Sequence, residues 1–292
     1  EFSLNNSNAI TIVWHISNFS HHYGGTWHTP TLGKSDTIQS QAQQEKNVFS
    51  AMLGIFLLMG IYHFGIFVQR PQRDTILWFS FLCFSFALTV ASGNYFFFID
   101  SWQASDLRHI AQVKLLSLSP VLVEIFTILY FARAIPSAWF DKFTRISVTV
   151  LAGLCGIMAL NSPTNLAVFF LPAIIIGTLF VIPLIVHVTM AILKNDREAR
   201  LLLLATGSLA LGGGLDLLAG FGIKVIDIPY PGGIGMVAFI AVQAHLLARR
   251  FSDAFETSER LSGNLQTAVE DRTKELELKS LEAMEASQVA LH

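Results

Sequence analysis

The sequence predicts a mainly α-helical polytopic membrane protein with seven transmembrane helices, a short N-terminal β-hairpin and a C-terminal coiled-coil helix. First, the 292 residues are 52% hydrophobic and only 14% charged, with a mean hydropathy of +0.53, whereas a soluble domain is about a quarter charged. Second, seven apolar stretches follow residues 1–47. Third, residues 249–292 are polar and carry apolar side chains at a helical spacing.

Residues 1–34 have the pattern of two short strands. In "AITIVWHIS" the side chains of Ile10, Ile12, Trp14 and Ile16 recur with the period of two of a β-strand, and Gly24-Gly25 supplies a turn. Because two strands cannot bury a core, we expect them to be the last strands of a larger β domain. Residues 35–47 are polar, and we expect them to form a linker helix into the first span.

Four of the nine histidines lie in this N-terminal segment: His15, His21, His22 and His28. Their spacing does not match the short-gap patterns of structural zinc sites, and no cysteine accompanies them. Neighbouring strand residues point to opposite faces, so His21 and His22 could not both reach one ion. We therefore expect a solvent-facing hairpin, with no metal and no cofactor.

The membrane domain is expected over residues 48–248. A transmembrane helix needs about 20 apolar residues. The seven stretches are Val48–Val68, Ile76–Phe98, Gln112–Ala132, Ile146–Leu160, Leu166–Leu193, Leu201–Ile223 and Gly232–Ala248. The fourth is short, although Phe143 and the residues beyond Leu160 can extend it, and the fifth contains Pro172 and Pro183, which predict a kink. Two other counts remain possible: six spans if the fourth stretch does not cross the membrane, and eight if the fifth stretch is divided into two helices.

Loop charges predict the orientation. Arginine and lysine cluster after the odd-numbered stretches, at Arg70, Arg73, Arg133, Lys142, Arg145, Lys194, Arg197, Arg200, Arg249 and Arg250. The opposite side carries only Arg108, Lys114 and Lys224. Because cytoplasmic loops are rich in lysine and arginine, we expect the N-terminus outside the cell membrane and the C-terminus in the cytoplasm.

Residues 249–292 predict a cytoplasmic signalling helix. Alternating spacings of three and four link Phe251, Phe255, Ser258, Ser262, Leu265, Val269, Arg272, Leu276, Lys279, Ala283, Ala286 and Ala290. This register predicts a parallel two-stranded coiled coil and hence a homodimer, with Arg272 and Lys279 fitting poorly. A single solvated amphipathic helix is the alternative. The chain does not begin with Met and ends without a helix cap, so we expect a segment of a longer protein.

Two acids in the apolar stretches are candidate ligand-binding residues. Glu124 lies near the middle of the third stretch and Asp216 in the outer half of the sixth. A charged side chain at the bilayer centre costs about 2.5–3.5 kcal/mol, so each should face other helices and have a partner. Structural hydrogen bonding and a ligand or proton role stay equally open for both. His63, His187 and His245 are expected to be buried, satisfied residues or interface anchors, and Cys83 and Cys155 buried free thiols.

Several classes of protein are excluded. The last apolar stretch has no lysine for a retinal Schiff base, and the third ends in "YFARAIP" without the acid-Arg-aromatic triplet of G-protein-coupled receptors. The chain has no phosphate-binding loop and no hydrolase or metalloprotease motif, so no catalytic residue and no enzyme activity are predicted in this segment. The net charge of −2 gives no basic field for nucleic acid.

Four sequence segments, which follow one another in the same order as in the family, resemble parts of the bacterial seven-transmembrane receptors with diverse intracellular signalling modules. "HISNFSHHYGGTWHTPTLG" resembles the end of their extracellular β-sandwich, and "LLMGIYHFGIFVQRPQRDTILWFSFLCF" is similar to their first pair of spans. "GGGLDLLAGFGI" places Asp216 where the family often has an aspartate before the exit of the sixth span. "YPGGIGMVAFIAVQAHLLARRFSDAFETSERLSGNL" resembles their last span and the following helix. Glu124 has no counterpart in the family's pattern.

The resemblance implies a protein of the bacterial inner membrane with a periplasmic N-terminus. Residues 1–34 would be the remnant of an extracellular β-sandwich sensor domain, jelly-roll-like, for carbohydrate or a similar small ligand. A signalling enzyme would follow inside, as an output domain after His292. That enzyme is often a histidine kinase of a two-component system, a nucleotide cyclase, a diguanylate cyclase or a phosphatase. "ELELKSLEAMEASQVALH" resembles the helix that leads into a histidine kinase dimerisation domain.

We therefore expect a receptor and transducer embedded in lipid. A small-molecule signal, sensed outside or within the bundle, would shift the helix packing and pass through Phe251 and Phe255 into the coiled coil. Arg272, a misfit at a core position, would let the coil hold two registers of similar energy. Two alternatives stay open: a proton-coupled secondary transporter with Glu124 and Asp216 as coupling acids, and a passive membrane anchor and dimeriser.

Overall fold

The computed structural model describes residues 33–69, 71, 74–93, 106–162, 165–193, 197–220, 223, 225–226 and 230–290, and all of its regular structure there is helical. The helices are α1 (Ser35–Gln69), α2 (Asp74–Gly93), α4 (Asp106–Ala134), α5 (Ala138–Leu160), α6 (Leu166–Leu193), α7 (Arg197–Gly220) and α8 (Pro231–Ala290). Each predicted apolar stretch overlaps one of these helices, and the mainly α-helical class is confirmed. The predicted hairpin at residues 1–32 lies outside the described residues.

Six helices are long and apolar enough to cross a membrane: α1, α2, α4, α5, α6 and α8. This count covers the described residues alone, and α7 is not in it. The fourth predicted stretch extends upstream to Ala138 and ends at Leu160, so it is not too short to span. α6 continues through Pro172 and Pro183 without being split. Pro120 lies inside α4, which the sequence analysis did not single out.

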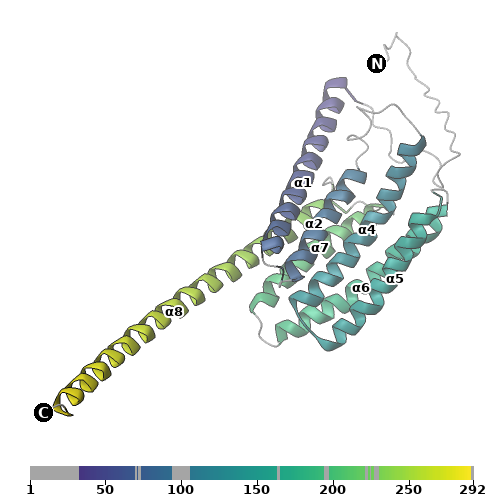
Figure 1. The fold of residues 1–292 in the computed structure, drawn as a ribbon. Coiled ribbons are helices and arrows are strands. Elements are labelled where there is room, and N and C mark those ends of the chain that lie inside the picture. Colours follow the sequence, from purple (N-terminus) through teal and green to yellow (C-terminus); the bar gives the residue numbers. More distant parts are fainter. Residues whose placement is uncertain are drawn as a thin grey trace, which may run out of the picture. The chain divides into compact units, whose positions relative to one another are not determined.

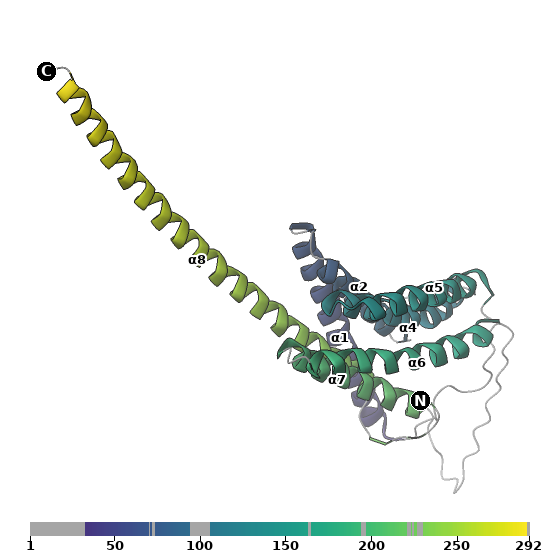
Figure 2. The same ribbon diagram turned by 90° about the horizontal axis from the view of Figure 1, so that it is seen from below.

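The two units of the chain are residues 1–242 and residues 243–292. In the first unit, α2 packs between α1 and α4, and α4 also contacts α5 and α6 (Figure 1). α6 in turn contacts α5 and α7, an arrangement that can be followed in the view turned by 90° (Figure 2). α4 therefore occupies a central position, and three of its polar side chains, Ser117, Ser119 and Thr127, are buried.

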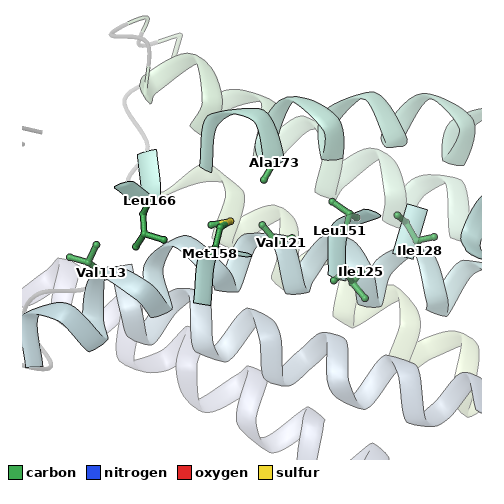
Figure 3. Close-up of a cluster of buried hydrophobic side chains, with 8 residues drawn as sticks. All are labelled: Val113, Val121, Ile125, Ile128, Leu151, Met158, Leu166 and Ala173. Atoms are coloured by element: carbon green, nitrogen blue, oxygen red, sulfur yellow. The ribbon is translucent and has the colours of Figure 1, made fainter. Parts of the chain in front are cut away.

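One buried apolar cluster holds α4, α5 and α6 together (Figure 3). Its members are Val113, Val121, Ile125, Ile128, Leu151, Met158, Leu166 and Ala173. Helix association within a bilayer depends on close packing, because lipid tails are as apolar as leucine. The interdigitation of these side chains therefore fixes the positions of the three helices.

A second cluster, which we call the aromatic cluster, consists of Phe79, Phe86, Tyr130, Phe131 and Phe239. Phe239, on the first turns of α8, is completely buried. Its ring lies 6.3–6.5 Å from the rings of the other four members, which belong to α2 and α4. These centroid distances are typical of packed aromatic pairs. The start of α8 is thus anchored by one side chain to two other helices.

Side chains of neighbouring helices satisfy several helix ends. Lys114 on α4 donates from Nζ to the carbonyl of Ala159 near the end of α5 (2.8 Å). His187 on α6 donates from Nε2 to the carbonyl of Ile135, directly after α4 (2.8 Å). The last carbonyls of a helix have no partner within that helix, and in hydrocarbon an unsatisfied carbonyl is expensive. These contacts explain why polar residues occur in otherwise apolar helices.

The second unit comprises the residues of α8 from Gln243 onward. The described side chains between Ser252 and Leu276 are largely exposed. Ion pairs within the helix join Arg260 to Glu256 (2.7 Å) and Glu275 to both Arg272 (2.5 Å) and Lys279 (2.8 Å). Exposed pairs of this kind contribute only a few tenths of a kcal/mol each. The helix is therefore not held by its own charges alone, and the predicted coiled coil stays a prediction.

Candidate functional site

The carboxyl group of Glu124 lies against α6, at Gly177. A Cβ atom added to Gly177 would come within 1.9 Å of all three carboxyl atoms of Glu124. Only glycine leaves room there, so the absence of a side chain on α6 provides the space that the carboxyl group from α4 occupies. The structure therefore places Glu124 between helices, as expected for an acid in an apolar stretch.

One oxygen of this carboxyl group is unusual. Glu124 Oε2 is buried and has no hydrogen-bond partner among the described residues. A buried polar atom without a partner is costly and calls for an explanation such as a water, an ion or a functional role. Two roles therefore remain possible for Glu124, as they were from the sequence: a structural hydrogen bond, or the binding of a ligand or proton.

Asp216 has a different environment, because it meets the first turn of α8. Its Oδ2 accepts a hydrogen bond from the backbone N–H of Gly232 (3.1 Å). Helices leave their first N–H groups without internal partners, and an aspartate commonly satisfies one of them from the N-cap position. Here the N-cap position of α8 is occupied by Tyr230, which cannot do this, and Asp216 supplies the carboxyl oxygen from α7.

Glycine allows this approach of α7 and α8. A Cβ atom on Gly232 would lie 2.0 Å from Asp216 Oδ2. A Cβ atom on Gly212 would lie 2.7 Å from the Pro231 carbonyl oxygen, and one on Gly235 2.4 Å from the Ser208 carbonyl oxygen. Small residues at such contacts let two helix backbones meet in a membrane. The sequence showed these glycines, but only the packing shows which of them face each other.

Tyr230 precedes α8 in a left-handed conformation, with φ 55°. Non-glycine residues rarely adopt it, and the following Pro231 restricts the choice further. The Tyr230 ring packs on Phe49 of α1 (5.4 Å between centroids) and covers Gly233. Burial, together with the charge of Asp216, raises the pKa of Tyr230 to about 12, so the hydroxyl stays protonated at neutral pH.

The three histidines that we singled out have separate environments. His63 is buried, donates from Nδ1 to the Met59 carbonyl (2.7 Å) and meets the edge of Phe79 (4.6 Å). His187 is buried, binds the Ile135 carbonyl and stacks on Phe140 (3.9 Å between centroids). His245, in contrast, is exposed. Hydrogen bonding and ring packing account for His187 as a structural residue, whereas the buried Nε2 of His63 has no hydrogen-bond partner among the described residues.

The predicted signal-coupling residues lie in the second unit. Phe251 is half-buried and Phe255 is exposed. Arg272 is exposed and pairs with Glu275 on its own helix. In the first unit, Glu124 lies against Gly177 and Asp216 against Gly232, so the two acids belong to different sets of contacts.

The chain matches the family described as 7TM diverse intracellular signalling over residues 45–250. The matched region includes α2, α4, α5, α6 and α7 completely and the transmembrane part of α8. Comparisons with curated proteins and with solved structures found no match.

The apolar helices and this match define a membrane protein of signal transduction. The chain belongs to the 7TM diverse intracellular signalling family. The expected resemblance is thereby confirmed, and a sensory membrane domain of this family is not itself catalytic.

Proposed function

We propose that this chain is the membrane transducer of a signalling receptor. A small-molecule signal, carbohydrate among the candidates, acts outside or within the bundle, and α8 carries the response to a cytoplasmic output module such as a histidine kinase or a cyclase. α7 completes the set of seven spans, with the N-terminus periplasmic and the C-terminus in the cytoplasm of a bacterial cell. The family match over residues 45–250 supports the signalling role.

The single observation that carries the coupling route is the apolar pattern of α8 beyond the membrane. Four register positions are apolar yet 59–69% exposed: Phe255, Leu265, Val269 and Leu276. Apolar side chains at heptad spacing on a polar helix are stabilised by a partner helix. A second copy of the chain satisfies the same pattern on both partners, so we propose a parallel homodimer.

Disulfide formation in membrane vesicles tests this dimer. Cys83 and Cys155 are first replaced by alanine, and single cysteines then replace Leu265, Val269 or Thr267 in the full chain. Cysteines at positions 265 and 269 are expected to form crosslinked dimers on mild oxidation, because core positions face the partner. The cysteine at position 267 faces away in this register and serves as the matched control. Equal crosslinking at all three positions, or none, contradicts the dimer.

Replacing the misfit arginine makes a second prediction. Arg272→Leu removes a charge from a core position and supplies the side chain that favours two-stranded coils there. We expect stronger crosslinking through the cysteine at position 269 and an output that no longer responds to stimulus in the receptor that carries its output domain. Arg260→Leu, outside the register, controls for the loss of a positive charge. An unchanged response in the Arg272→Leu receptor contradicts the role of Arg272.

A second candidate function is favoured by the partnerless Oε2 of Glu124. A buried acid of this kind is typical of proton-coupled transport. In reconstituted vesicles, proton-coupled uptake that is abolished by Glu124→Gln would assign the chain to the transporters. A passive anchor would instead leave the crosslinking pattern of α8 unchanged by every substitution in the membrane domain.

A further inference from the structure

We propose that the contact of Asp216 with the first turn of α8 is a latch that holds α8 in one position against α7, and that its release moves the signalling helix. The latch consists of Asp216, Gly232, Gly212, Gly235 and Ser208. This inference rests on the proposed transducer function, because it assigns the point at which the membrane helices control α8.

The hydrogen bonds at the start of α8 show why Asp216 matters. Pro231 has no N–H group, and the N–H groups of Gly233 and Ile234 donate to the Tyr230 carbonyl (3.1 and 3.4 Å). The N–H of Gly232 remains, and the Asp216 carboxyl accepts its hydrogen bond. Every backbone N–H group of the first turn of α8 is therefore hydrogen-bonded, and one of the acceptors, the Asp216 carboxyl group, belongs to α7.

The glycine contact and these hydrogen bonds together hold α8 against α7. At Gly212 and Gly235 the two backbones touch without side chains between them. A residue with a Cβ atom that a shift of α8 brought to either position would clash with the opposing backbone, so α8 keeps one register against α7 while the contact lasts. Two contacts in the described residues join α7 to α8 here. The Gly232 N–H donates to Asp216 Oδ2 (3.1 Å), and the Ser208 hydroxyl, whose shorter hydrogen bond goes to the Ala205 carbonyl within α7 (2.8 Å), also approaches the Gly235 carbonyl (3.3 Å).

Strain next to the latch favours a second position. Tyr230 is held in a left-handed conformation that its bulky side chain disfavours. Residues in such conformations persist only when their surroundings impose them, and they cluster at switch regions. Release of Gly232 would free Tyr230 to relax, so the latched state stores strain that the released state does not.

Amide exchange and crosslinking of the full chain in lipid nanodiscs test the latch together. Asp216→Ala removes the acceptor, whereas Asp216→Asn keeps one. Gly235→Ala places a methyl group against the Ser208 carbonyl and separates the helices. Gly213→Ala is the matched control, because a Cβ atom there meets nothing within 4 Å. Each variant is combined with the single cysteines at positions 265, 267 and 269.

Asp216→Ala is expected to accelerate exchange at residues 232–236 by about fivefold, the size of a lost N-cap contact. The same variant and Gly235→Ala are expected to shift crosslinking between positions 265, 267 and 269. Asp216→Asn and Gly213→Ala should leave both measurements as in the parent chain.

The outcomes separate the latch from the transducer function. Unchanged exchange in Asp216→Ala overturns the latch. Faster exchange with an unchanged crosslinking pattern also overturns it, because the contact is then only a helix cap, while the dimeric transducer stands. Absence of crosslinks in the parent chain itself overturns the proposed dimer, and the exchange data then still report on the contact of Asp216.

Discussion

Phe239→Ala is expected to lower the midpoint of thermal unfolding by roughly 4–8 °C, at about 2–4 °C per kcal/mol for a chain of this size. Phe239 is completely buried, and its ring packs on four other rings from α2 and α4. Because lipid is as apolar as the cluster, the loss comes from the cavity and from missing contacts, on the order of 2 kcal/mol.

Thermal unfolding in lipid nanodiscs, followed by circular dichroism, measures the effect. Ile234→Ala is the matched control, because Ile234 lies on the same helix but is 48% exposed and loses little packing. We expect a change of less than about 0.5 kcal/mol for an exposed substitution of this kind. If the two variants unfold at the same temperature, the aromatic cluster does not anchor α8.

Gly177→Ala is the second substitution with a large expected effect. The added methyl group would overlap the Glu124 carboxyl group, which must then leave its place between α4 and α6. Overpacking of this kind costs about 1–3 kcal/mol, although alanine is otherwise the better helix former by about 1 kcal/mol. We therefore expect a lower unfolding midpoint, measured as for Phe239→Ala.

A double substitution isolates the contact. Glu124→Ala removes the carboxyl group, so Gly177→Ala should become neutral or stabilising in that background. Gly153→Ala, where a Cβ atom meets nothing within 4 Å, controls for the helix preference of alanine. Additive effects of Gly177→Ala and Glu124→Ala would show that the two residues do not touch.

The candidate residues differ in how much of their role the sequence could predict. An acid in an apolar stretch, such as Glu124 or Asp216, is visible in the sequence because it raises the cost of insertion. Their partners, Gly177 and Gly232, are not, because a glycine in a membrane helix has many uses. His187 shows the same limit: its target is the carbonyl of Ile135, a backbone atom that carries no sequence signal.

The helical class, the apolar stretches and the membership of a signalling family were determined by the sequence itself. Backbone groups in hydrocarbon must bond within their own helix, so composition along one segment is enough to predict that helix. The tertiary structure alone decided that Asp216 caps α8, that Gly177 accommodates Glu124 and that Phe239 joins α8 to α2 and α4. These contacts join residues of different helices, and close packing rather than local composition selects which residues meet.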